Sequence, residues 1–339
     1  MTHQEIVFAD KGRIELHALE ASVPLQAGEV RGPTLCSLIS PGTELAWAAE
    51  GPFPVRPGYA AVFRAEEFGS DVTGIAPGTL LLCMGPHRSV QQVEARYTVP
   101  LPAGLAPEEA LLARLMGVSM TTLMTTTARP GDRVMVCGAG PVGFLAAQLF
   151  HLAGYEVMVV EPDEARRRDV EASGLTMTFA RIPVDDPAIC GSVALVVDCS
   201  GHEQSVLDAC AVVRQHGEVV LVGVPWRRQT EIHAHALLDL VFRNFVVLRS
   251  GWEWELPLHA IGFQWEQLLA GYNNSAQSIF SGFAKALRWL AEGRIAVGGL
   301  LCTVDPRNAA SVYGDLMHRR TRALFLVFDW SLPKAQGPG

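Results

Sequence analysis

Three glycines at a fixed spacing are the first residues of this sequence whose types could do chemistry. Gly138, Gly140 and Gly143 form the pattern G-x-G-x-x-G, with Pro141 and Val142 before the last glycine. Between a strand and a helix, such glycines permit a tight turn, close approach of a pyrophosphate and close helix–strand packing. The first amides of the helix then point at the phosphates. The pattern predicts a dinucleotide-binding loop, with a purely structural glycine turn as the alternative.

An acidic residue follows these glycines at the spacing at which a ribose is recognised. Glu161 ends the next strand-like run, EVMVVE, about 20 residues after the first glycine. A carboxylate there accepts hydrogen bonds from the ribose hydroxyls and repels a 2′-phosphate, so it favours NAD over NADP. The run Arg166 to Arg168 favours the opposite, but a charge run on a helix is ordinarily a solvated face. We therefore expect NAD as the cofactor, with NADP less favoured.

Two further segments end where a cofactor would lie. The runs VVDCSG and LVGVP are interpreted as the ends of the fourth and fifth strands of a parallel sheet. The carboxyl ends of such strands face the cofactor crevice. The residues expected to line it are Ser200, Gly201, Gly223 and Val224. For each of them, an ordinary turn after a strand is the alternative.

Strand and helix patterns alternate around these residues. Near-continuous valine and leucine runs occur at 132–138, 156–161, 193–201, 217–225 and 245–251. A parallel sheet that is covered on both faces requires such runs. The segment 141–154 instead has an apolar face at helical spacing. The alternation predicts the α/β fold class, with a Rossmann, doubly wound parallel sheet.

The sequence before and after these alternating segments has a different pattern of apolar residues. Residues 1–118 contain short apolar runs broken by Pro and Gly, which predicts a β-rich domain with several turns. After residue 253 we expect helices near 278–292 and 307–318 and a last strand, ALFLVFD. Residues 331–339 are interpreted as a disordered end.

The composition excludes several classes of protein. The chain has 339 residues, enough for two domains, and a net charge of −8, so nucleic acid and anionic membranes are poor partners. No apolar run is long enough to span a membrane, and the first residues lack the apolar core of a signal peptide. The seven cysteines include no Cys-x-x-Cys pair, so reduced thiols are expected. These features predict a cytoplasmic enzyme that acts on a small molecule.

Four segments resemble the medium-chain dehydrogenase/reductase superfamily, which is zinc-type alcohol dehydrogenase-like. They are ARPGDRVMVCGAGPVG, SPGTE at 40–44, RPGYAAVFRAEEFG at 56–69 and GPHRS. The last three are most similar to a subgroup that includes bacteriochlorophyllide and cyclitol-type dehydrogenases. The resemblance covers nearly all of residues 1–330. It implies a GroES-like β-rich catalytic domain formed by 1–118 and 254–330, a Rossmann domain at 119–253, and a homodimer.

The resemblance fails at the residues that bind the catalytic zinc. Zinc-dependent members carry Cys-Gly-Thr-Asp, Gly-His-Glu and a later Glu or Cys, but here the three positions hold Ser40, Tyr59 and Ala113. A catalytic zinc needs three Cys, His or Asp/Glu side chains and an open position. The cysteines of the superfamily's structural zinc lobe are missing as well. We therefore expect no metal; Cys36, Cys83 and His87 match no alternative ligand spacing.

Without zinc, a hydrogen-bond donor must stabilise the alkoxide that develops during hydride transfer. Tyr59 is the leading candidate because it replaces a metal ligand, with a packing tyrosine as the alternative. Thr43 matches the hydroxyl that relays the proton in the superfamily, and Ser40 lies near it in sequence. His87 is expected to end a relay to solvent, since the ordinary pKa of histidine suits that task, or to be an incidental loop residue.

Two tryptophans complete the set of candidate residues. Trp252 and Trp254 follow the last Rossmann strand in the run SGWEWELP. The superfamily places residues beside nicotinamide and substrate there, so the resemblance implies an apolar wall of the substrate pocket. A packing patch is the alternative.

Together these features predict a zinc-independent, NAD-dependent oxidoreductase. It would transfer a hydride between nicotinamide and a secondary alcohol or ketone, cyclic or polyol-like. An NADPH-dependent quinone or enoyl reductase is the alternative among enzymes, although Glu161 disfavours NADPH. A dinucleotide-binding protein without catalysis is the alternative outside enzymes. The sequence names neither the substrate nor the direction of the reaction.

Overall fold

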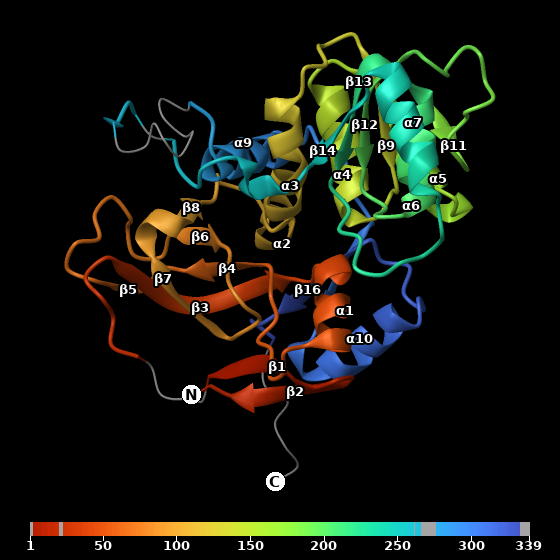
Figure 1. The fold of residues 1–339 in the computed structure, drawn as a ribbon. Helices are drawn as coiled ribbons and strands as arrows, with labels where there is room; N and C mark the ends of the chain where they lie inside the picture. Colours follow the sequence, from red (N-terminus) through yellow and green to blue (C-terminus); the bar gives the residue numbers. More distant parts are fainter. Residues whose placement is uncertain (1–2, 20–22, 261, 266–275, 333–339) are drawn as a thin grey trace. The chain divides into compact units, whose positions relative to one another are not determined.

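The chain forms two compact units in a computed structural model that describes residues 3–19, 23–260, 262–265 and 276–332 (Figure 1). The first unit comprises 1–114, 290–292 and 297–339, and the second comprises 115–289 and 293–296. The second unit is the predicted nucleotide-binding domain, and the first is the predicted β-rich domain.

The second unit contains a six-stranded parallel sheet in the order β11-β10-β9-β12-β13-β14. Its strands are β9 (Arg133–Cys137), β10 (Glu156–Val160), β11 (Thr178–Phe179), β12 (Val193–Asp198), β13 (Val213–Leu221) and β14 (Val247–Ser250). The order reverses its direction between β9 and β12, which is the mark of a doubly wound sheet. The predicted α/β fold class is confirmed.

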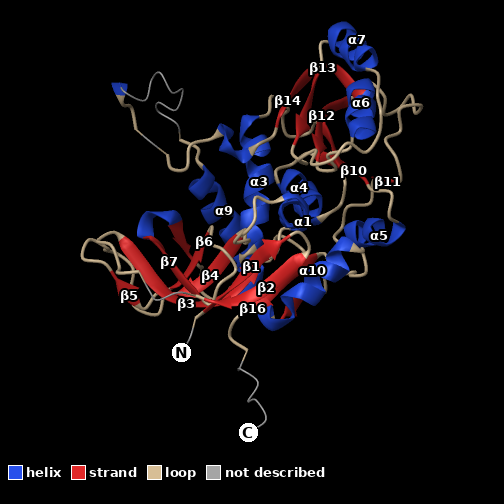
Figure 2. Cartoon of the chain, turned by 60° about the horizontal axis from the view of Figure 1, so that its bottom comes forward, coloured by secondary structure: helices blue, strands red, loops and turns tan. Residues whose placement is uncertain are grey.

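Four helices connect these strands. They are α4 (Pro141–Leu152), α5 (Glu164–Ala172), α6 (Glu203–Val212) and α7 (Ala234–Asn244). Right-handed crossovers place helices on opposite faces of the sheet on the two sides of the reversal. Figure 2 shows α6 and α7 side by side. Because both faces are covered, strand residues such as Met135, Val196 and Val219 have no exposed surface.

Two longer helices extend the second unit beyond the sheet. Most of α3 (Leu112–Thr125) and of α9 (Ile279–Ala291) belongs to it, and η2 (Glu253–Glu255) follows β14. Gly117 of α3 contacts the ring of Phe283 from α9 so closely that an added Cβ would lie 2.3 Å from that ring. This packing groups residues 254–289 with the nucleotide-binding unit. The second compact unit thus continues to residue 289, whereas the sequence analysis expects the return to the β-rich domain at 254.

The first unit is β-rich. An eight-stranded sheet has the order β15-β16-β3-β4-β6-β8, with β5 and β7 paired to β3, and β1 and β2 form a separate pair. The strands are β1 (Gln4–Asp10), β2 (Arg13–Ala18), β3 (Glu29–Leu38), β4 (Ala60–Arg64), β5 (Glu67–Phe68), β6 (Leu80–Cys83), β7 (Val90–Glu94), β8 (Thr98–Pro100), β15 (Leu301–Val304) and β16 (Phe325–Asp329). The C-terminal strand β16 pairs with β3, so the chain returns to this unit as expected.

Helices cover part of this sheet. They are α1 (Pro41–Glu50), α2 (Pro107–Ala110) and α10 (Ala309–Met317), with short η1 (Ala95–Tyr97) and η3 (Pro306–Asn308). A core of fully buried side chains that includes Phe8, Tyr313 and Phe328 lies among them. The helices expected at 278–292 and 307–318 are confirmed within a few residues. Most of the tail expected at 331–339, residues 333–339, lies outside the described residues.

Over the ranges that the structure describes, no helix combines the length and the apolar character needed to cross a membrane.

The α3–α9 contact gives a first prediction. Gly117→Ala should lower the free energy of unfolding by about 1–3 kcal/mol, because its Cβ would meet the Phe283 ring at 2.3 Å. Gly282→Ala is the matched control: its Cβ would meet Met120 at an ordinary 3.7 Å, so the gain in helix propensity, up to about 1 kcal/mol, should dominate. Chemical denaturation measures both. An equal change in the free energy of unfolding in both variants would contradict the close contact between Gly117 and the Phe283 ring.

Candidate functional site

The glycine loop after β9 has a backbone that other residues cannot adopt. Gly138 has a φ of +90°, and its N–H donates to the carbonyl of Val160 at 2.7 Å. A Cβ on Gly143 would lie 1.8 Å from the carbonyl oxygen of Gly138. The first and last glycines therefore serve the tight turn and the close packing of α4 on the loop, as the pattern predicts.

The ends of three strands meet beside this loop. A Cβ on Gly138 would lie 3.3 Å from the backbone nitrogen of Ser200, which follows β12. A Cβ on Gly223, after β13, would lie 2.5 Å from the nitrogen of Gly201, and one on Gly201 would lie 2.8 Å from the carbonyl oxygen of Val224. The structure thus brings the predicted cofactor residues of all three loops together, at the point where the strand order reverses.

The N-terminus of α4 suits an anion. Gly140 is the N-cap and supplies no side-chain acceptor to the first amides of the helix. Pro141 and Val142 form the first turn and are both half-buried. An added Cβ on Gly140 meets nothing within 4 Å, so this part of the loop is open. Unsatisfied amides and the helix dipole together favour a phosphate at such a position.

Glu161 holds the glycine loop in place. It is 6% exposed, and its two carboxylate oxygens accept hydrogen bonds from the N–H groups of Ala139 at 2.8 Å and Asp163 at 2.9 Å. Arg166 approaches one of these oxygens at 3.9 Å. The carboxylate therefore fixes the loop as well as standing where a ribose would be recognised, and this positioning role was not apparent from the sequence.

Asp198 positions the second loop and was missed by the sequence analysis. It has no exposed surface, and its carboxylate accepts hydrogen bonds from the Ser200 hydroxyl at 2.6 Å, the Ser205 hydroxyl at 3.0 Å and the Gly201 N–H at 3.0 Å. Burial raises the pKa of Asp198, and these hydrogen bonds oppose the shift. Its own carbonyl accepts the Gly223 N–H at 2.7 Å. An acid within an apolar strand was the available signal.

The two tryptophans lie at the same edge of the sheet. Trp252 and Trp254 follow β14, whose end is tied to β13 by the Gly251 N–H and the Leu221 carbonyl at 2.8 Å. Trp252 is 67% exposed and Trp254 is 39% exposed. Both rings therefore keep apolar surface open at the carboxyl edge of the parallel strands.

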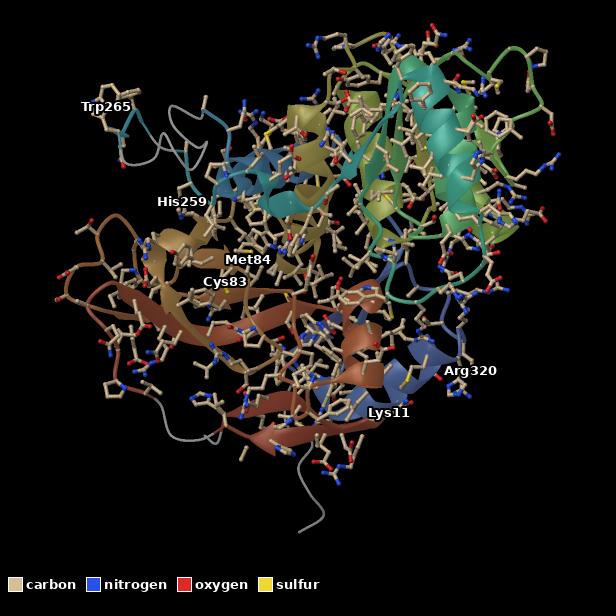
Figure 3. The ribbon with its side chains drawn as sticks, viewed as in Figure 1. Lys11, Cys83, Met84, His259, Trp265 and Arg320 are labelled. Atoms are coloured by element: carbon tan, nitrogen blue, oxygen red, sulfur yellow. The ribbon has the colours of Figure 1, made fainter. Side chains whose placement is uncertain are left out.

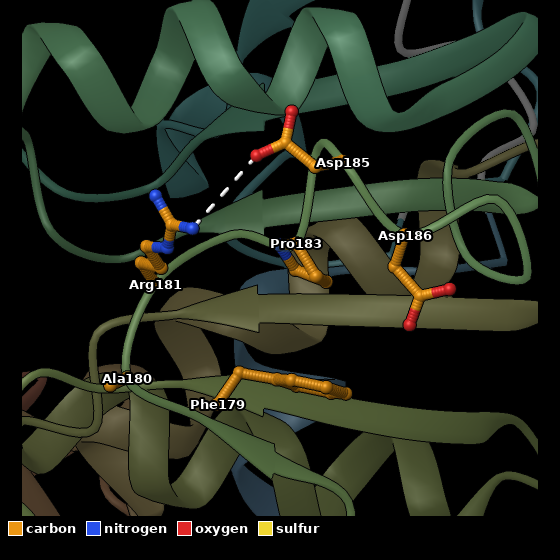
Figure 4. A pocket seen from close by; sticks show the side chains of 6 residues that line it. All are labelled: Phe179, Ala180, Arg181, Pro183, Asp185 and Asp186. Atoms are coloured by element: carbon orange, nitrogen blue, oxygen red, sulfur yellow. Dashed lines mark ion pairs between the residues drawn. The ribbon is translucent and has the colours of Figure 1, made fainter.

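A pocket at the outer strand β11 lies away from the point where the ends of β9, β12 and β13 meet. It is lined by Phe179, Ala180, Arg181, Pro183, Asp185 and Asp186, as Figure 4 shows. Its ion pair, Arg181 with Asp185 at 3.8 Å, joins two highly exposed side chains. β10 and β9 separate β11 from the strand reversal, so the pocket is not the predicted cofactor crevice.

A buried carboxylate organises the polar cluster of the first unit. Glu44, in the first turn of α1, has no exposed surface. One of its oxygens accepts the Ser40 N–H at 2.9 Å. The other accepts the hydroxyl of Tyr313 and lies 3.1 Å from Nε2 of His87. Burial and this carboxylate raise the pKa of Tyr313 well above its ordinary value.

His87 is the second member of this cluster and is fully buried. Its Nδ1 lies 2.7 Å from the hydroxyl of Ser37, which also accepts the indole N–H of Trp330 at 2.8 Å. With the proton on Nε2, the imidazole donates to Glu44 and accepts from Ser37. The expectation that His87 ends a relay to solvent is therefore wrong, because both ring nitrogens have buried protein partners and the side chain has no exposed surface.

Tyr59 directly precedes β4 and is half-buried. The preceding Gly58 has a φ of +134°, and a Cβ there would lie 2.4 Å from the backbone nitrogen of His87. The His87 N–H donates to the Pro57 carbonyl at 2.8 Å. The segment before Tyr59 is thus fixed against the His87 loop.

A buried cation lies on the ring of Tyr59. The guanidinium carbon of Arg114 is 4.1 Å from the centroid of that ring, and Arg114 is 4% exposed. Ala113, beside it in α3, is fully buried. Arg114 was not recognised as a site residue, although a charged residue within the apolar run LLARLM was a signal.

The remaining candidates divide between this cluster and the β-sheet. Ser40 is the N-cap of α1 and is 7% exposed, while Thr43 is half-buried in the first turn of that helix. Cys83 ends β6, next to Met84, and both are labelled in Figure 3. Burial raises the pKa of Cys83 to about 12. Cys36 precedes Ser37 on β3 and so points to the opposite face from the residue that binds His87. These two thiols and His87 therefore do not form one ligand set.

Comparison with known proteins agrees with this arrangement. A family model described as zinc-binding dehydrogenase matches residues 141–253. L-galactonate-5-dehydrogenase of Escherichia coli K12 is 31% identical over 137 residues, which cover 37% of this chain and 38% of that relative. The chain thus matches about two fifths of that relative's length.

Solved structures show the same fold over nearly the whole chain. Galactitol-1-phosphate dehydrogenase from Escherichia coli has a TM-score of 0.79 at 16% identity, covering 96% of this chain and 99% of that chain. A protein from Sinorhizobium meliloti 1021 that is bound to NADP has a TM-score of 0.74 at 17% identity, covering 97% and 99%. The chain therefore has the medium-chain dehydrogenase/reductase fold, with a Rossmann domain and a GroES-like domain.

Substitutions at two glycines of the loop should distinguish an effect on folding from an effect on cofactor binding. Gly143→Ala should lower stability, since its Cβ would lie 1.8 Å from a backbone oxygen. Gly140→Ala should leave the unfolding temperature unchanged, because its Cβ meets nothing within 4 Å, yet weaken NADH binding by obstructing a pyrophosphate. Thermal unfolding and NADH fluorescence titration measure the two effects. Undiminished NADH affinity in Gly140→Ala would show that the dinucleotide does not use this loop.

The Tyr313 contact predicts a pH-dependent stability. Tyr313→Phe should destabilise the protein by about 1–3 kcal/mol at pH 7, because the buried Glu44 loses a donor. The raised pKa favours neutral Tyr313 in the folded state, so its contribution is complete below the unfolded pKa of about 10 and is lost as the pH rises through the folded pKa. The difference between wild type and variant should therefore shrink above about pH 10.

Denaturation at a series of pH values measures this difference. A Tyr313→Phe variant as stable as wild type at pH 7 would contradict the proposed importance of the Glu44 hydrogen bond.

Proposed function

We propose that this protein is a zinc-independent, NAD-dependent oxidoreductase that transfers a hydride between nicotinamide and a secondary alcohol or its ketone, cyclic or polyol-like. The observation that carries the proposal is the packed glycine loop at the strand reversal, with the open N-terminus of α4 and the carboxylate of Glu161 beside it. Bound nicotinamide would supply or accept the hydride. The chain's own residues would hold its phosphates at α4 and its ribose near Glu161.

The names of similar proteins support the substrate class. L-galactonate and galactitol 1-phosphate, which name two of them, are open-chain polyhydroxy compounds with secondary alcohols. The two exposed tryptophans after β14 offer an apolar surface against which the carbon skeleton of such a compound can pack. A secondary alcohol of this kind is the substrate class that we propose.

The choice of NAD rests on Glu161. Its carboxylate would repel a 2′-phosphate, which favours NAD over NADP. Arg166 at 3.9 Å offsets part of that charge, and a protein of the same fold is bound to NADP. We therefore propose a preference for NAD that is moderate in size.

The donor chemistry in the first unit does not fit a catalytic zinc. Among the three positions that resemble zinc-ligand positions, Ala113 has no donor atom, and Ser40 and Tyr59 are not usual zinc ligands. The guanidinium on the Tyr59 ring would also repel a dication placed at that residue. Both features support zinc independence. In its place Tyr59 would stabilise the substrate oxygen, with Thr43 and Ser40 near the cluster as further hydroxyl groups.

The proposal predicts activity with NAD on a panel of polyols, sugar acids and cyclic alcohols. Zinc in the purified protein should be well under one atom per chain, and chelators should leave turnover intact.

NADH should bind more tightly than NADPH, and Glu161→Gln should narrow that difference in affinity because the charge that repels the 2′-phosphate is removed. Glu161→Asp, which keeps the charge, is the control.

Three results would reject parts of this proposal. Turnover of quinones or enones with NADPH, and of no alcohol, would replace it with the reductase alternative. NADH binding without turnover of any member of the panel would indicate a dinucleotide-binding protein without catalysis. Stoichiometric zinc with chelator-sensitive turnover would reject zinc independence.

A further inference from the structure

Arg114 and Tyr59 differ in their access to solvent. Arg114 is 4% exposed, whereas Tyr59 is half-buried. Tyr59 is therefore more accessible to a small molecule than the guanidinium on its ring. An effect of Arg114 on a reaction in this region would act through the Tyr59 ring that it contacts.

The contact brings a fixed positive charge to a group that can carry a negative one. A guanidinium 4.1 Å from a ring centroid is attracted to the negative face of the ring, and the attraction is larger where water is excluded. Arginine stays charged at all ordinary pH values. When a phenol loses its proton, a cation at this distance stabilises the phenolate more than the neutral phenol.

Both residues are held by rigid surroundings. Arg114 lies in the first turn of α3, beside Leu112 and Ala113, which are fully buried. Tyr59 follows Gly58, whose backbone leaves no room for a side chain against the His87 loop. The cation and the ring are therefore placed by the fold before any ligand arrives.

Three other charged groups near this segment have described partners away from the Tyr59 ring. Glu44 and His87 bond to each other and have no exposed surface. Arg56, three residues before Tyr59, forms an ion pair with Glu5 at 2.9 Å. Arg114 is the charged group that the described contacts place on the Tyr59 ring itself.

We propose that Arg114 is a positioning residue that stabilises the phenolate form of Tyr59, so that Tyr59 exchanges a proton with the substrate oxygen. The inference rests on the proposed function. In the oxidation direction, the alcohol O–H proton passes to the Tyr59 phenolate, the hydride leaves the same carbon for NAD⁺, and the C=O bond forms. The products are the ketone, NADH and neutral Tyr59. In the reverse direction Tyr59 returns the proton to the oxygen.

Ultraviolet titration of the phenols tests the inference without any substrate. The difference between wild type and Tyr59→Phe isolates the ionisation of Tyr59. Its pKa should lie below the ordinary value of about 10 in wild type. Arg114→Met should raise it by about one unit or more, and Arg114→Lys should restore much of the shift.

The chain offers a matched control for the lost cation. The guanidinium of Arg96 lies 4.7 Å from the ring centroid of Tyr97, but its side chain is 64% exposed. Arg96→Met should leave the ionisation of Tyr59 unchanged. An equal change in the Tyr59 pKa in Arg114→Met and Arg96→Met would indicate a general effect of net charge and would overturn the inference.

Kinetics give a second measurement once a substrate is known. In Arg114→Met, kcat for alcohol oxidation at neutral pH should fall about tenfold for each unit by which the Tyr59 pKa rises, because less Tyr59 is then phenolate, with little change in KM. The alkaline shift of the kcat profile should match the shift in the phenol titration. A lowered kcat with an unshifted profile would indicate a merely structural role for Arg114.

The titration also separates failure of this inference from failure of the proposed function. A Tyr59 pKa at or above the ordinary value in wild type overturns the inference, even if no Arg114 variant folds. A lowered pKa in a protein that turns over no alcohol overturns the proposed function and leaves the Arg114–Tyr59 coupling in place.

Discussion

The first unit depends on satisfying one buried carboxylate. Glu44 has no exposed surface, and leaving its charge without partners would cost several kcal/mol. Its donors come from Ser40, His87 and Tyr313, which are far apart in the sequence. The start of α1, the loop after β6 and the C-terminal helix α10 must therefore meet at one point. The C-terminal segment returns to the first unit in part because Glu44 requires the Tyr313 hydroxyl.

The same carboxylate fixes the place of the candidate catalytic residue. Glu44 orients His87, and the backbone of His87 packs on Gly58 and binds Pro57. Tyr59 follows directly, so its backbone position is set by contacts that do not involve its side chain. In this arrangement the residue type at position 59 can change while the backbone stays in place. That independence would permit a tyrosine at the position that resembles the histidine of Gly-His-Glu in zinc-dependent dehydrogenases.

Local patterns predicted most of the fold and the glycine turn. Apolar runs located β9, β10, β12, β13 and β14 but not the two-residue β11, and the glycine spacing predicted the turn before α4, because these signals lie within a few residues. The Glu44–Tyr313 contact and the stacking of Arg114 join residues that share no local pattern. The packing of α9 on α3 likewise joins segments that share no local pattern. His87 looked like a surface loop residue because its partners, Ser37 and Glu44, are distant in sequence.

Charged residues within apolar runs were the strongest unused signal, since burial of a charge requires a specific partner. Asp198 ends a strand of valines, and hydroxyl and amide donors surround it. Arg114 lies within LLARLM, and its described partner is the face of an aromatic ring. A dication at Tyr59 and the guanidinium on its ring would repel each other strongly in a buried environment. In the proposed zinc-independent site, the positive charge of Arg114 would therefore take the place of the charge that a metal ion supplies.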